Sequence, residues 1–476
     1  MATTPPLTAA FPADWNVIAD GHGSFTRDQM HFPFPVSPLT ASSFPAFCDG
    51  HVAGLRSLGI PESAFDVRVV NHYRYDRQVM QVPASEAEGA ALAERTEQAI
   101  RRELDRMIDR WFGEHRPRLA ALDARLRQMQ PRGADNAIVL ALLDEADAIL
   151  REAWQIHFTV VPPMTLAMQL LREMHADLFG DDGDGALTLM AGGATESMKA
   201  GFGLADLAVR ARDLNLVDTF LATPVDALMP ALADTDAGRA FLTDLNAYLD
   251  EYGWRQDLFD LATPTWRENP AIALAGVHRY LETGYDARAA HVEIGRAAEA
   301  AFEAALDQLA DYPAAVSEQF ERLVQLGRQG AFLQEEHNFY IDQRILSLLH
   351  HFYRAVGEAL VDRAVLDSPD DVFMLYLDEI RELFGQPDLA PRADEARALA
   401  HRRRAELAQA ATLSPPLAIG EPVDAGPHPD TPMTRSLAAF FGWGPSHVPE
   451  SGRVFGMSGS RGVVSGPARV ARTLDE

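Results

Sequence analysis

Cysteine is almost absent from this sequence, since Cys48 is the only one among 476 residues. A single thiol allows neither an intramolecular disulfide nor a thiolate metal cluster. The sequence also lacks a charged N-terminal stretch followed by an apolar one, so no secretory signal peptide is predicted. No run approaches the roughly 18 uninterrupted apolar residues of a membrane-spanning helix. These absences are typical of a cytoplasmic protein.

Positive charge is scarce as well. The chain has 42 Lys and Arg against 69 Asp and Glu, which gives a formal net charge of −27. Such a balance opposes binding to phosphate backbones or anionic membranes, so neither a nucleic acid nor a membrane partner is predicted. A hydrophobic fraction of 47% and a charged fraction of 23% are ordinary for a soluble globular protein.

The predicted fold class is mainly α, with a large helical domain, a small extended or β N-terminal segment and a short C-terminal β segment. Residues 1–85 are rich in proline and aromatics and are interpreted as an extended strap packed on the helical body. Residues 86–411 form the helical domain, 412–450 a proline-rich connector, and 451–476 the beginning of a further domain. Helices are predicted at 86–129, 135–158, 163–179, 195–213, 235–251, 287–328, 331–363, 371–383 and 391–410. The ranges 86–129 and 287–328 are each one long helix or a broken pair.

The stretch from Phe332 to Arg344 is the predicted chemical centre. At about 100° per residue, His337, Tyr340 and Arg344 fall on one helical stripe, and Glu335, Asn338 and Asp342 fall on another. Apolar residues lie between the stripes, so the helix is expected to be buried and its charged groups to need partners or a role. A histidine with an arginine beside it can bind an anionic group and move a proton near neutral pH. The alternative is a structural polar network between helices.

The candidate site residues lie in three stretches of the sequence. The candidate catalytic residues are His337, Arg344 and Glu336, and the candidate substrate-binding residues on the same segment are Tyr340 and Asp342. Trp254 and Arg255, after a helix ending at Gly253, offer a flat aromatic and a cation to a ligand, or form an ordinary packed turn. His31 and Phe34 belong to a proline-spaced aromatic run that lines an aromatic pocket or packs as a strap.

No metal centre is predicted, because the histidines show neither His-x-x-x-His nor His-Glu-x-x-His spacing. Carboxylate sites assembled from distant helices stay open. The pair Gly192-Gly193 is not a phosphate loop, because no Gly-Lys-Ser/Thr follows it.

The order of these motifs resembles one family. Trp15, Asp20 and His31-x-Pro-x-Pro lead to Gly192 and Thr195, then to Tyr252-Gly-Trp-Arg255 and Pro264-x-Trp-x-Glu-x-Pro270, and finally to Glu335-Glu-His-Asn338. Over roughly residues 10–472 the pattern is similar to the acceptor-binding helical domain of PEP-utilising, rifampin phosphotransferase-like and phenylphosphate synthase-like dikinases. The glycine run at 456–466 resembles the opening of their swivelling phosphohistidine domain.

The resemblance implies a dikinase-type reaction. A nucleotide domain cleaves ATP, a histidine of the swivelling domain carries the phosphoryl group, and the helical domain holds an acceptor hydroxyl of a phenolic or other aromatic small molecule. His337 is implied as the base, with Arg344 or Arg255 neutralising the phosphoryl oxygens. Gly253-Trp254-Arg255 stands where relatives usually read Gly-His-Arg.

The chain itself has no ATP-grasp-like domain and no phosphohistidine segment. ATP and Mg²⁺ are therefore expected on a separate domain or subunit, and the chain is expected to be incomplete without a nucleotide-binding and a phosphohistidine partner. The alternatives are a small-molecule-binding or scaffold protein that has lost phosphotransfer, or a descendant that catalyses an elimination or hydration in the same helical pocket.

Overall fold

The computed structural model describes residues 11–15, 24–60, 62–80, 84–180, 184–420, 431–433 and 435–436. In these residues the fold is mainly α with one small antiparallel sheet, as predicted. The predicted connector lies mostly outside the described residues, and the segment 451–476 lies entirely outside them. Within the described part, no helix is long and apolar enough to cross a membrane.

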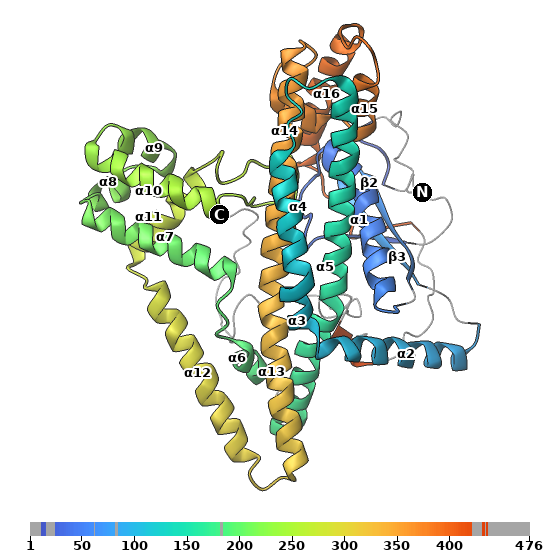
Figure 1. Cartoon of the computed structure of the whole chain (residues 1–476), viewed down its shortest axis with the longest axis vertical. Helices are drawn as coiled ribbons and strands as arrows, with labels where there is room; N and C mark the ends of the chain where they lie inside the picture. The colour runs from blue at the N-terminus through green and yellow to red at the C-terminus, as the bar shows by residue number, and fades with distance from the viewer. Residues whose placement is uncertain are drawn as a thin grey trace.

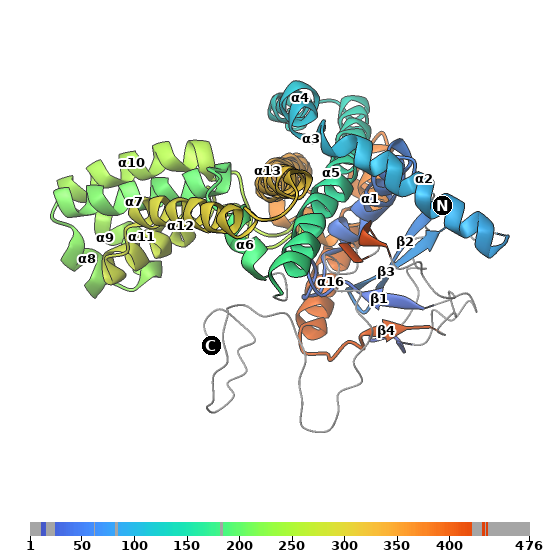
Figure 2. The same ribbon diagram turned by 90° about the horizontal axis from the view of Figure 1, so that it is seen from below.

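A long helical rod is the axis of the molecule (Figure 1). It consists of α13 (Ala314–His337), the π-helical segment η2 (Asn338–Ile345) and α14 (Leu346–Asp362). The 44-residue helix α5 (Asn136–Phe179) runs beside it. Seen from below, α5 lies between α13 and α1 (Pro38–Ser57), and the sheet lies on the far side of α1 (Figure 2).

Helix α5 continues through Pro162-Pro163, where a break was predicted, so that expectation is wrong. The two prolines remove the N–H groups that would bond the carbonyls of Phe158 and Thr159. The helix nevertheless persists, because residues 156–167 are all buried between neighbouring elements. Tertiary packing therefore outweighs the lost hydrogen bonds.

Helix α1 is a second difference, because the region before residue 85 was expected to be extended. Ser37 caps the helix through its side chain, and Pro38 occupies a first-turn position that tolerates proline. The helix meets α5 at two glycines: a Cβ on Gly50 would lie 2.6 Å from the Arg151 carbonyl oxygen, and one on Gly54 would lie 2.7 Å from that of Gln155. Only glycine permits so close a crossing.

The sheet has four antiparallel strands in the order β2-β3-β1-β4. Strands β2 (Glu62–Val70) and β3 (Tyr73–Met80) form a hairpin whose two-residue turn, Asn71-His72, has positive φ at both positions. A two-residue turn with positive φ at both positions matches the right-handed twist of the two strands that it connects. Strand β1 (Phe25–Arg27) pairs with β3 and with β4 (Ala418–Ile419), so the end of the helical body closes onto the N-terminal strands.

The other helices surround this frame. On one side lie α2 (Glu86–Leu104), α3 (Met107–Arg110), the π-helical η1 (Trp111–His115) and α4 (Arg116–Gln128), so the predicted range 86–129 is broken. The C-terminal part contains η3 (Pro369–Met374), α15 (Leu377–Phe384), η4 (Ala390–Arg392) and α16 (Ala393–Ala410).

A helical arm projects from the rod (Figure 1). It comprises α7 (Glu196–Asp213), α8 (Val217–Ala222), α9 (Val225–Ala233), α10 (Asp236–Tyr252) and α11 (Ala271–Thr283), and it has a hydrophobic core of its own. Helices α6 (Asp184–Met190) and α12 (Ala287–Gln308) connect it to the rod. Because α12 ends before Pro313, the predicted range 287–328 is also broken.

Candidate functional site

The packing of α13 on α5 places two histidines face to face. A Cβ on Gly330 would lie 2.8 Å from the Met164 carbonyl oxygen, and one on Gly327 would lie 2.7 Å from Leu171, so the two helices run antiparallel in close contact. His337 follows Gly330 by seven residues, and His157 precedes Met164 by seven. Seven residues are about two turns of an α-helix. The same register therefore sets His157 opposite His337, and their rings lie 4.8 Å apart.

A π-helical segment adds a third group. In an α-helix, residues five apart differ by about 140° in direction, so Asp342 would point away from His337. The segment Asn338–Ile345 is π-helical, which spaces hydrogen bonds five residues apart and returns Asp342 toward the same face. Asp342 Oδ1 lies 3.3 Å from His157 Nδ1. Ligand-type atoms of His157, His337 and Asp342 all lie within 4.8 Å of one another, and we name this set the buried cluster.

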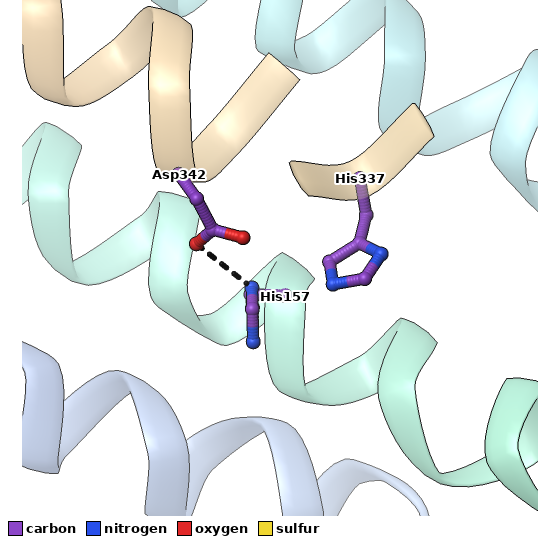
Figure 3. Close-up of side chains that lie close together, drawn as sticks. All are labelled: His157, His337 and Asp342. Atoms are coloured by element: carbon purple, nitrogen blue, oxygen red, sulfur yellow. Dashed lines mark ion pairs between the residues drawn. The ribbon is translucent and has the colours of Figure 1, made fainter. Parts of the chain in front are cut away.

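The buried cluster is enclosed, with exposed fractions of 9% for His157, 3% for His337 and 7% for Asp342. His337 Nδ1 lies 2.7 Å from the Leu333 carbonyl oxygen and donates to it, which leaves Nε2 unprotonated in the neutral ring. Figure 3 shows that this second nitrogen is directed toward His157. Burial, with His157 beside it, lowers the pKa of His337 to about 4. Burial would raise the pKa of Asp342, but His157, His337 and His31 hold it below its usual value.

A second pair, Asp28 and His31, lies at the edge of this region. His31 Nδ1 lies 3.1 Å and 3.2 Å from the two Asp28 carboxylate oxygens, and the Met30 and His31 backbone N–H groups donate to Asp28 Oδ1. No partner for His31 Nε2 is found in the described chain. Burial alone would lower the pKa of His31, but the hydrogen bond and charge of Asp28 raise it. His31 also interacts electrostatically with Asp342 and His337.

The His31 side chain is 36% exposed, so it is more accessible than the buried cluster. Its ring lies 5.8 Å from the half-buried Phe259, which in turn lies 6.3 Å from Phe32. Half-buried Phe34 stands 6.0 Å from Phe32. An imidazole with one nitrogen held by a carboxylate and the other free, beside aromatic rings, can accept a proton from a bound aromatic hydroxyl.

The other predicted catalytic residues do not join the buried cluster. Arg344 Nε donates to the carboxylate of Asp123 on α4. Glu336 is buried and accepts a hydrogen bond of 2.8 Å from the Glu196 backbone N–H at the start of α7, and burial raises its pKa. Tyr340 lies beneath the Arg116 guanidinium, 5.0 Å from it. These three residues hold α13 and η2 to the arm and to α4.

Trp254 and Arg255 lie in the segment that leads out of α10. Trp254 Nε1 donates to the Asp250 carbonyl oxygen, and two guanidinium groups, those of Arg127 and Arg267, lie over its ring. The Arg255 guanidinium lies 4.5 Å above the Trp266 ring, and its buried Nε has no hydrogen-bond partner in the described structure. Burial lowers the pKa of Arg255, which also interacts electrostatically with Glu335.

Sequence reasoning did not identify two members of these clusters, His157 and Asp28. His157 lies 180 residues before His337 in the chain and carries no metal-type spacing, so only the register of α5 on α13 shows the pairing. Asp28 could have been found from its position three residues before His31, within reach of a local carboxylate–imidazole contact.

A groove of about 670 Å³ lies elsewhere, on the arm between α7 and α10. Lys199, Phe202, Tyr248 and Arg288 are among its lining residues, and none of the buried cluster is. The groove therefore offers a separate surface rather than an entrance to the histidines.

Comparisons with known proteins find one matching family and two relatives. Residues 155–335, from just before His157 to just before His337, match the family described as the rifampicin phosphotransferase fourth domain. The chain is 28% identical over 488 aligned residues to a chondramide synthase of Chondromyces crocatus, covering 99% of this chain and 12% of that protein. It is 26% identical over 341 residues to the uncharacterized phosphotransferase YvkC of Bacillus subtilis, covering 71% of this chain and 39% of that protein. The chain thus spans well under half the length of these curated relatives.

Proposed function

Since residues 155–335 match the rifampicin phosphotransferase fourth domain and the chain resembles a phosphotransferase, we propose that it is the acceptor-binding portion of a cytoplasmic, phosphohistidine-dependent phosphotransferase driven by ATP. The acceptor is a hydroxyl of a phenolic or other aromatic small molecule. ATP and Mg²⁺ belong to a separate nucleotide-binding domain or subunit, and a further domain carries the phosphohistidine. The family match supports phosphotransfer, while the acceptor class and the dikinase route are part of the proposal.

The observation that carries the proposal is the Asp28–His31 pair. His337 was predicted as the base, but it is enclosed, and one of its nitrogens is committed to the Leu333 carbonyl. His31 has the accessible nitrogen, a carboxylate that orients it, and Phe259 beside it. We therefore move the base role to His31. His337 and its neighbours in the buried cluster then act on His31 only through their electrostatic interaction with it.

In the transfer step, the acceptor oxygen forms a bond to phosphorus while the phosphorus–nitrogen bond of the phosphohistidine breaks. The nitrogen keeps the bonding pair. The hydroxyl proton passes to His31 Nε2. Phosphoryl transfer depends mainly on positioning and on neutralising the equatorial oxygens. We assign that neutralisation to Arg255 rather than Arg344, because Arg344 is paired with Asp123 and the buried Arg255 Nε lacks a hydrogen-bond partner in the described structure.

The test is phosphoryl transfer measured by ³¹P NMR. The chain is mixed with ATP, Mg²⁺, a panel of phenols and the nucleotide and phosphohistidine domains of a full-length family member supplied in trans. We expect a new phosphate-ester signal that depends on the chain. His31→Ala should lower the rate by about 100-fold or more, as for loss of a general base, whereas His278→Ala on α11 should leave it unchanged. An equal rate for His31→Ala and wild type would remove His31 from the proposal.

One observation favours a second candidate. The match to the chondramide synthase covers 99% of the chain, against 71% for the phosphotransferase. The same helical body can therefore also serve a protein with a different named activity, as a small-molecule-binding module or as the site of an elimination or hydration. Compounds that bind the chain but never acquire phosphate in the ³¹P experiment would support this second candidate.

A further inference from the structure

We propose that His157, His337 and Asp342 bind one divalent first-row transition-metal ion, of the Zn²⁺ or Co²⁺ type. The proposal concerns the buried cluster alone and does not depend on phosphotransfer. Two imidazoles from α5 and α13 and one carboxylate from η2 meet at this point of the molecule (Figure 3). Within the described residues, the ligand atoms of these three side chains lie close enough to one another to share a metal ion.

The donor atoms are arranged as ligands. The hydrogen bond from His337 Nδ1 to the Leu333 carbonyl fixes the tautomer and leaves an Nε2 lone pair facing the cluster. Histidines that bind metals usually donate their other nitrogen to a carbonyl or carboxylate in this way. His157 Nδ1 faces Asp342 Oδ1 but makes no aligned hydrogen bond, although it is buried. A buried imidazole nitrogen without a hydrogen bond needs an explanation, and a cation between the two groups supplies one.

Asp342 gives a second, independent indication. It is 7% exposed, and within the described residues it pairs with a histidine, His157, rather than with a lysine or arginine. Burying a carboxylate is costly unless a full countercharge or several hydrogen bonds compensate it. An imidazole supplies a full charge only when it is protonated, whereas a dication supplies one in every protonation state of the histidines.

The dimensions suit an ion of this class. Metal–nitrogen and metal–oxygen bonds of about 2.0–2.2 Å place tetrahedral ligands about 3.3 Å apart. His157 Nδ1 and Asp342 Oδ1 are already 3.3 Å apart. The whole set lies within 4.8 Å, so a side-chain shift of about 1.5 Å, the difference between these distances, completes the site.

The ligand chemistry selects the ion. Two nitrogens and one oxygen suit Zn²⁺, Co²⁺, Fe²⁺ or Mn²⁺, whereas Ca²⁺ and Mg²⁺ prefer oxygen ligands. The thiol of Cys48 is not in the cluster. Three protein ligands leave a position open, as in metal sites that bind a further molecule. The proposed ion also cross-links α5 to the rod, so it should stabilise the fold.

The experiment is calorimetric titration of the whole chain with Zn²⁺, in buffer containing excess Mg²⁺ to occupy weak surface carboxylates. Co²⁺ absorption spectra report the ligand set, and metal content is measured after dialysis. We expect one Zn²⁺ per chain, visible-region Co²⁺ bands, and a rise in melting temperature. Asp342→Asn and His157→Ala should weaken binding at least about 100-fold, since even the loss of an outer-sphere partner costs about 10–100-fold. His175→Ala, on the same helix as His157, should bind normally.

Two results would overturn the proposal. One is the absence of stoichiometric Zn²⁺ or Co²⁺ binding to the wild-type chain. The other is unchanged affinity in Asp342→Asn and His157→Ala, with circular dichroism showing that both are folded. Asp342→Asn keeps the shape of the side chain, so it serves if His157→Ala does not fold. Metal binding without acceptor phosphorylation would leave this inference intact and count against the proposed function, and the reverse result would do the opposite.

Discussion

Replacing Gly330 by alanine tests the helix contact on which the buried cluster depends. The added Cβ would lie 2.8 Å from the Met164 carbonyl oxygen and 3.1 Å from Met168 Cγ. Met168 has a flexible side chain that can yield, but the carbonyl belongs to the backbone of α5 and moves only with the helix. The substitution should therefore push α13 away from α5 and shift His337, two turns further on, relative to His157.

The magnitude follows from two opposing effects. Alanine stabilises a helix interior by about 1 kcal/mol relative to glycine. Overpacking a close contact costs about 1–3 kcal/mol, and contact with backbone favours the upper part of that range. The net change in the free energy of unfolding is expected to be a loss of about 1–2 kcal/mol.

Urea unfolding of Gly330→Ala, followed by circular dichroism, measures this change. The matched control is Gly295→Ala on α12, where an added Cβ meets no atom within 4 Å. The control should be more stable than wild type by up to about 1 kcal/mol. If Gly330→Ala proves as stable as Gly295→Ala, the close antiparallel contact of α13 with α5 is refuted, and with it the register that pairs the two histidines.

Two further predictions concern carboxylates that accept hydrogen bonds, Asp260 and Glu268. Asp260→Ala leaves the Ser37 N–H, the Ser37 hydroxyl and the Thr40 hydroxyl without the carboxylate that accepts from them. It should therefore lower the free energy of unfolding by about 3 kcal/mol in urea titrations. The control Asp286→Ala removes an exposed helix cap and should lower the free energy of unfolding by only about 1 kcal/mol. For Glu268, burial would raise the pKa, but its contacts with His350 and its other neighbours lower it to about 2. The stabilisation from this carboxylate is then complete above about pH 4.5 and disappears as the pH falls toward 2. The free energy of unfolding, measured between pH 5 and pH 2, should fall less steeply with decreasing pH in Glu268→Gln than in wild type. An identical pH dependence in the two proteins would contradict the assignment.

The sequence predicted the fold class well, because amphipathic periodicity and strand alternation are local signals. The predicted helices 195–213 and 235–251 start at Thr195 and Thr235, and the structure shows both threonines capping α7 and α10 through their side chains. Prolines were less informative. Pro162 and Pro163 lie inside α5 and Pro38 begins α1, because burial and helix position decide whether a proline is tolerated.

The candidate site was predicted only in part. His337 and Asp342 were placed on different stripes by assuming 100° per residue, an assumption that fails in the π-helical segment Asn338–Ile345. His157 joins them through a helix register set by glycine contacts between distant segments, which a single sequence does not reveal. His31 was identified from its aromatic setting, whereas the carboxylate that orients it, Asp28 three residues earlier, was not identified.

Acceptor binding at His31 is the most direct test of the central claim. Small aromatic hydroxyl compounds are screened against the wild-type chain by saturation-transfer NMR, and the affinity of each binder is then measured by calorimetry in wild type, His31→Ala and His278→Ala. Loss of one hydrogen bond to the acceptor hydroxyl should weaken binding by about 10-fold in His31→Ala and not in His278→Ala. Binders whose affinity is unchanged in His31→Ala would contradict the account, because the acceptor would then lie elsewhere on the molecule.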